Sequence, residues 1–78
     1  MKPTTFIKTT LGDLINVLDA RSTICIYGYD AKTDKETLLR NMYYVYEIYT
    51  WNYFEKIKDA SVIGLRTGLN TTTILIEW

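Results

Sequence analysis

The chain has 78 residues, nine of them basic and nine acidic, so its formal net charge at pH 7 is zero. This balance argues against a nucleic-acid backbone or an anionic membrane as the main partner, because clustered Lys and Arg supply the affinity for both. With no histidine and one cysteine, Cys25, the chain can form neither a disulfide within the monomer nor a zinc site of the usual kind.

Length and hydropathy predict one domain spanning residues 1–78. A chain of this size buries only about 60% of the surface that its unfolded form exposes, so dense aromatic packing or self-association must add stability. No segment approaches the roughly 20 consecutive apolar residues of a membrane span. One free cysteine fits a reducing compartment, and we expect a cytoplasmic protein.

A helix is predicted directly after Thr10. The motif Thr10-Leu11-Gly12-Asp13 places a hydroxyl three residues before a carboxylate, a typical helix start signal. Apolar residues then recur on one helical face: Leu11, Leu14, Ile15 and Leu18. The preceding segment, Thr4–Thr9, is β-prone and is expected to be an extended arm or an edge strand.

The segment Thr23–Tyr29 reads as a strand, because β-branched and aromatic residues alternate in it before a polar stretch. Alternation divides its side chains between two faces. Ile24 and Ile26 share one face. Cys25, Tyr27 and Tyr29 share the other.

The next segment holds most of the aromatic residues: seven of eleven lie between Tyr43 and Phe54. Its β-branched and aromatic side chains favour a strand over Thr37–Ile48, paired with the first strand through a loop. A helix is the alternative, because Thr33-Asp34-Lys35-Glu36 is a second capping-box match. A short helix with Thr50 as its cap is expected to follow.

Two further strands, 61–67 and 71–78, are predicted around the loop Gly68-Leu69-Asn70, whose residues suit a positive φ. The element order is then α-β-β-α-β-β. We expect a small α+β domain in which an antiparallel sheet of about four strands carries two helices.

The residues provide little for catalysis. Without histidine there is no Ser-His or Cys-His pair, and Cys25 is expected to be a buried, inert thiol. The spacing of the three nearby acids matches no calcium-binding loop, and we expect these residues in a solvated hairpin loop: Asp30, Asp34 and Glu36. We therefore expect no enzyme, no metal and no cofactor.

The strand interpretation divides the aromatic residues between core and surface. Tyr44, Tyr46, Trp51 and Phe54 are assigned to the core. An ionisable Glu47 should face water, and it would share its face with Tyr43 and Tyr49. Two paired strands would then present a binding face with Glu47 beside four tyrosines: Tyr27, Tyr29, Tyr43 and Tyr49. Tyrosine is enriched at interface centres, although cross-strand tyrosine pairs could instead only stabilise the sheet.

The helix motif from Thr10 to Asp19, the strand Thr23–Tyr27 and the closing hairpin resemble a group of short uncharacterised proteins from phages and mobile elements of Gram-positive bacteria. The resemblance implies a context in which such proteins bind host proteins, including those of defence systems, in the host cytoplasm. It therefore suggests a phage-type inhibitor. The alternatives are an oligomeric sponge for a small nucleotide signal and a structural phage component.

A homodimer is also expected. The last strand, from Thr71 to Trp78, contains no Lys, Pro or bulge signal that would protect a sheet edge. If this strand lies at a sheet edge, self-association would use that edge; otherwise it would use the binding face that carries the four tyrosines. Alternatively, the arm Thr4–Thr9 covers the same edge within one chain.

Overall fold

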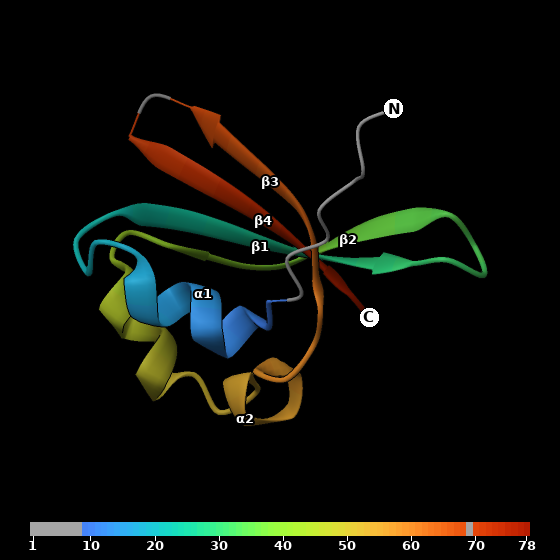
Figure 1. The fold of residues 1–78 in the computed structure, drawn as a ribbon, viewed down its shortest axis with the longest axis horizontal. Coiled ribbons are helices and arrows are strands. Elements are labelled where there is room, and N and C mark those ends of the chain that lie inside the picture. Colours follow the sequence, from blue (N-terminus) through green and yellow to red (C-terminus); the bar gives the residue numbers. More distant parts are fainter. Residues whose placement is uncertain (1–8, 69) are drawn as a thin grey trace, which may run out of the picture.

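The computed structural model describes residues 9–68 and 70–78. It is an α+β fold in which a four-stranded sheet carries short helices on one face (Figure 1). The elements in chain order are α1 Leu11–Val17, β1 Thr23–Asp30, β2 Lys35–Met42, the 3₁₀ helix η1 Val45–Thr50, α2 Phe54–Ile57, β3 Val62–Gly68 and β4 Thr71–Glu77. The predicted fold class is confirmed. Of the predicted arm, residues 4–8 lie outside the described residues.

The sheet has the strand order β2-β1-β4-β3. Two antiparallel hairpins, β1-β2 and β3-β4, are joined by a parallel pairing of β1 with β4, so the sheet is mixed rather than antiparallel throughout. The connection through η1 and α2 carries the chain past the helical face of the sheet, which lets β4 return between β1 and β3. Dimerisation through the edge of the last strand, which required this strand to lie at a sheet edge, is therefore contradicted, and the edges are β2 and β3.

Helix α1 begins as its sequence indicates. The Thr10 hydroxyl accepts a hydrogen bond from the Asp13 backbone N–H at 3.2 Å, which caps the first turn. Leu11 and Ile15, four residues apart, are buried against the sheet. The helix ends at Val17, and the backbone of the next residue, Leu18, is extended.

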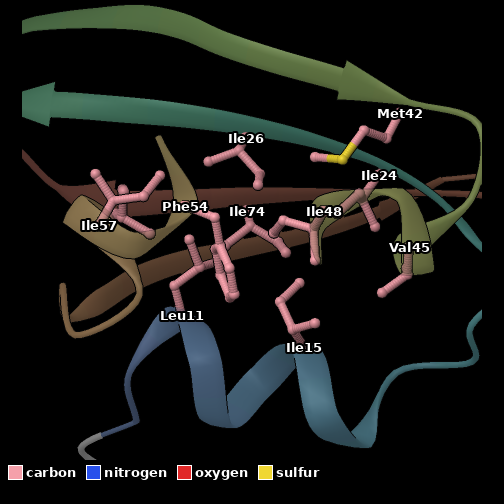
Figure 2. Close-up of a cluster of buried hydrophobic side chains, with 11 residues drawn as sticks. Leu11, Ile15, Ile24, Ile26, Met42, Val45, Ile48, Phe54, Ile57 and Ile74 are labelled. Carbon is pink, nitrogen blue, oxygen red and sulfur yellow. The ribbon is translucent and has the colours of Figure 1, made fainter. Parts of the chain in front are cut away.

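A single hydrophobic core lies between the sheet and the helices (Figure 2). Alternation along β1 and β4 turns four isoleucines into it, all with no exposed surface: Ile24, Ile26, Ile74 and Ile76. Phe54 and Ile57 from α2 pack between these strands and α1. The predicted division of β1 into two faces is confirmed. No described helix covers the opposite face of the sheet, here called the open face.

The aromatic segment is only partly a strand. β2 ends at Met42, and the chain then turns into η1. The reason is the spacing of Val45 and Ile48: a 3₁₀ helix has three residues per turn, so both side chains point into the core, where they are 2% and 0% exposed. The strand predicted over Thr37–Ile48 is therefore correct only up to Met42.

Two further expectations for this segment are corrected. Tyr44 and Tyr46, which the strand interpretation places in the core, are 43% and 51% exposed, because Val45 and Ile48 of η1 take the core positions instead. Thr50 does not cap α2. It closes the last turn of η1, where its hydroxyl donates a hydrogen bond to the Glu47 carbonyl at 2.8 Å. Phe54 is buried as predicted, and Trp51 is half-buried.

The connection between β1 and β2 is a tight turn rather than a helix start. Asp34 has φ 55° there, and Asn70 has φ 61° beside β4. Asp and Asn tolerate this left-handed region better than most residues, so both suit hairpin turns. The second capping-box match of the sequence is thus a turn signal.

Candidate binding surfaces

Four exposed tyrosines line η1 and its entrance, and we call them the tyrosine ridge: Tyr43, Tyr44, Tyr46 and Tyr49. Their exposed fractions are 80%, 43%, 51% and 61% in that order. The rings of Tyr44 and Tyr46 stack with centroids 5.3 Å apart and an interplanar angle of 9°. The ridge therefore presents phenol rings to solvent from one short segment.

The backbone beneath the ridge is tied to the rest of the fold. The Thr23 hydroxyl donates to the Tyr43 carbonyl at 2.9 Å, and the Tyr46 N–H donates to the Ala20 carbonyl at 3.3 Å. Together with the buried side chains of Val45 and Ile48, these bonds hold the segment against the start of β1. The tyrosines thus project from an ordered support.

Tyr49 is also fixed by its side chain. Its hydroxyl donates to Asn16 Oδ1 of α1 at 3.2 Å, and its ring meets that of Phe54 edge-on with centroids 5.9 Å apart. Tyr49 therefore lies on the helical side of the molecule. Because its ring remains 61% exposed, it can still contact a partner.

The predicted binding face is divided in the structure. Tyr27 and Tyr29 lie half-buried on the open face of β1. Tyr43, Glu47 and Tyr49 belong to the segment that leaves the sheet after Met42. These five residues therefore do not form one surface, because the strand that would have aligned them ends too early.

Glu47 has a local structural contact. Its carboxylate accepts a hydrogen bond from the Tyr44 backbone N–H at 3.0 Å, at the start of η1. This bond satisfies a backbone donor that the first turn of a helix leaves free. Glu47 thus holds the start of η1 in place and is less available to orient a partner.

The open face carries a groove of about 480 Å³. Its lining includes Tyr27 and Leu75 from the central strands and Gly64 from β3. Glu36 and Arg66, both exposed, lie on the two edge strands. Over residues 9–68 and 70–78, the only ion pair joins Lys58 to Glu55 at 3.2 Å, so Glu36 and Arg66 carry unpaired charges.

A short hydrogen bond closes the hairpin beside this groove. The Tyr29 hydroxyl donates to Asp34 Oδ1 at 2.6 Å. This bond raises the pKa of Tyr29 above its usual value, because ionising the phenol would break the bond and place a second negative charge next to the carboxylate. The neighbouring Asp30 carboxylate accepts the Lys32 N–H at 2.9 Å, so both acids stabilise the turn.

The described residues contain no group of three or more His, Cys, Asp or Glu side chains placed to hold a metal ion. Cys25 is half-buried on the open face, which corrects the expectation of a buried thiol. It lies on this face because it alternates with Ile24 and Ile26, which take the core positions.

Comparisons with protein-family models, with curated proteins and with solved structures give no match. None of the helices in the described part of the chain is long and apolar enough to cross a membrane. The surfaces themselves are therefore the basis for a functional proposal.

Sequence reasoning missed two parts of these surfaces. Tyr44 and Tyr46 belong to the ridge, and Glu36, Arg66 and Leu75 belong to the groove. The ridge had a signal: Val45, Ile48 and Trp51 recur every third residue, which is the period of a 3₁₀ helix. No sequence pattern indicated the groove, because it depends on the parallel pairing of β1 with β4, which are far apart in the sequence.

Proposed function

We propose that this chain is a non-enzymatic binding protein that recognises another protein through the tyrosine ridge. The observation that carries the proposal is the exposure of Tyr43, Tyr44, Tyr46 and Tyr49 on a segment whose Val45 and Ile48 are buried. A small domain rarely exposes so many large rings on one short segment without use, since exposed apolar clusters mark interaction sites.

The chemistry of the ridge suits protein recognition. Tyrosine supplies a large amphipathic contact area at a low cost in side-chain entropy, because it has only two side-chain torsions to fix. The stacked pair and the Tyr49–Asn16 bond order the rings before a partner arrives. Each hydroxyl can also bond to a polar group at the rim of the contact.

The partner that we propose is a host protein. The resemblance to short phage and mobile-element proteins supports this class, and the specific form of the proposal is an inhibitor that covers a host surface in the cytoplasm. The chain's zero net charge favours a partner bound through rings rather than through long-range attraction.

A nucleotide sponge is the rival function. The groove has the volume of a small-molecule site, for which about 300–1,000 Å³ is typical. Its charges argue against phosphate, however. Among the residues that the structure describes, Arg66 is the only cation of the groove lining, Glu36 also lines the groove, and Glu77 lies beside Tyr29 in the next strand.

The test is affinity capture from host lysate with matched variants. The double substitution Tyr44→Ala with Tyr46→Ala should remove the captured partner, because losing an interface anchor costs about 2 kcal/mol or more, roughly thirtyfold in affinity. Leu65→Ala is the control, since Leu65 on β3 is 51% exposed, as Tyr46 is.

Retention of the partner by the ridge variant would contradict the proposal. So would release of a stoichiometric nucleotide when the purified wild type is heated, which would support the sponge. Turnover of a substrate by the pure protein would exclude both.

A further inference from the structure

The open face has an ordered arrangement of side chains that the pairing of the strands determines. Residues directly opposite each other in neighbouring strands share a face of the sheet. The central row of the open face runs across all four strands: Leu38, Tyr27, Leu75 and Gly64. It is apolar apart from the Tyr27 hydroxyl, and its Leu38 side chain is 45% exposed.

The rows on either side of this centre carry the charges. Glu36 lies on β2 opposite Tyr29, on one side of the central row. Arg66 lies on β3 opposite Thr73, which in turn pairs with Cys25, on the other side. Glu36 and Arg66 are therefore at diagonally opposite corners of the groove, with Tyr27 and Leu75 between them. Glu77 of β4 lies on the other side of Tyr29, in the same row as Glu36.

The Glu36 and Arg66 corners are complementary to each other in a second copy. When two open faces are brought together, a two-fold axis between them and perpendicular to the line from Glu36 to Arg66 exchanges the two corners. Each Glu36 then faces Arg66 of the other copy, which gives two identical ion pairs around a shared apolar centre. Such a contact has the symmetry of a closed dimer, in which the same patch is used twice.

We propose that two copies of this chain pack open face to open face through this charged groove. The helices would lie outside, and the two sheets would form a sandwich with spacing of about 10 Å. Each copy would bury Leu38 and complete the burial of Tyr27 and Cys25. A domain of this length gains much from such burial, because so little of its surface is buried within the monomer.

The second copy fits this surface better than a foreign ligand does. The groove lining described by the structure has one acid, Glu36, and one base, Arg66, so it suits a partner that offers the same two charges in exchanged positions, and this chain offers them. The contact is also separate from the tyrosine ridge, whose Tyr49 lies on the helical side. The dimer would therefore leave both ridges free.

The experiment is sedimentation equilibrium with charge-reversed variants. The wild type should show a mass above the 9.1 kDa of the monomer, rising toward twice that value with concentration. Arg66→Glu alone or Glu36→Arg alone should weaken association by roughly tenfold or more, because each places like charges across the contact. Added salt should weaken the wild-type dimer as well.

The decisive measurement is a mixture of the two single variants. The Glu36→Arg variant carries two bases in the groove and the Arg66→Glu variant carries two acids, so their equimolar mixture should restore a dimer. The double variant E36R/R66E should restore a homodimer. A misfolded variant could not be rescued in this way. Both substituted side chains are exposed, so each variant should keep the circular dichroism of the wild type.

Three results would overturn the proposal: a wild-type mass of 9.1 kDa at every concentration, dimers that persist in both single variants, or a mixture that remains monomeric. Loss of the dimer in the variant Tyr44→Ala with Tyr46→Ala would also overturn it, because the ridge would then be the contact between copies. Partner capture is measured independently, so failure of one proposal leaves the other testable.

Discussion

Gly28 shows how a single residue fixes the packing at one end of the sheet. It is buried in β1, and a Cβ atom at this position would lie only 2.6 Å from the ring of Trp78. That ring is also held by a hydrogen bond from its Nε1 to the Tyr53 hydroxyl at 2.9 Å. A side chain at residue 28 would therefore displace Trp78 and break its hydrogen bond to Tyr53, the residue before α2.

We predict that Gly28→Ala destabilises the protein by about 1–3 kcal/mol, the usual cost of overpacking. Urea denaturation followed by tryptophan fluorescence measures this cost. Gly68→Ala on β3 is the matched control, since the nearest atom to its new Cβ would be the Thr71 carbonyl oxygen at 3.8 Å. Equal losses in the two variants would contradict the clash.

Tyr29 gives a second prediction at this scale. Its pKa is raised by the hydrogen bond to Asp34, so the folded state holds this proton more tightly than the unfolded state. The stabilising effect is complete below the ordinary tyrosine pKa of about 10 and is lost as the pH rises through the raised value. Asp34→Asn should lower the ionisation midpoint of Tyr29 in NMR titrations of ring-labelled tyrosine. An unchanged midpoint would show that Asp34 does not set this pKa. The Tyr29→Phe variant, which lacks the Tyr29 hydroxyl, identifies the NMR signal of the Tyr29 ring.

Among the elements, η1 separates a stability role from a binding role within six residues. Ile48 has no exposed surface, whereas Tyr46, two residues away, is 51% exposed. The first side chain belongs to the core and the second to the tyrosine ridge.

We predict that Ile48→Ala costs about 2–5 kcal/mol of unfolding free energy, as buried aliphatic truncations do. Tyr46→Ala should cost less than about 1 kcal/mol, apart from the loss of its stacking on Tyr44. Chemical denaturation of the two variants provides the comparison. A loss for Tyr46→Ala as large as that for Ile48→Ala would place Tyr46 in the core.

The elements also show which parts of the fold can be predicted from sequence. Thr10 and the apolar spacing after it predict α1 correctly, and the alternation in β1 predicts which isoleucines are buried. These signals are local. The end of β2 at Met42 was missed, because β-prone residues continue beyond it, and only the three-residue spacing of Val45, Ile48 and Trp51 indicates η1. The predicted binding face does not form for the same reason, because it required the second strand to continue beyond Met42.

For the whole molecule, the decisive feature is the position of β4 between β1 and β3. Its place could not be read from the sequence, because a strand of Thr and Ile suits either an edge or a centre, and the parallel pairing of Thr23 with Thr71 spans most of the chain. In the described residues, β4 is the sheet partner of both β1 and β3.

We therefore predict that residues 1–70 alone do not fold. Removing β4 takes away Ile74 and Ile76, both fully buried, and separates β3 from the sheet. Circular dichroism and the dispersion of amide NMR signals measure the loss. A cooperative unfolding transition in the shortened chain would contradict this prediction. Adding a peptide of residues 71–78 should restore part of the signal if β1 and β2 keep their pairing.

The central place of β4 has a consequence for how the protein is made. Translation delivers β4 after every other element described here, so the growing chain has no partner for β3 and no complete core to bury Ile24 and Ile26. Contacts between distant parts of a chain also form slowly, because a long loop must close before they are gained. Until β4 is delivered, we expect the nascent chain to expose apolar strands, which are the kind of surface that chaperones protect. The yield of native protein should therefore depend on chaperone supply during synthesis more than the small size of the domain would suggest.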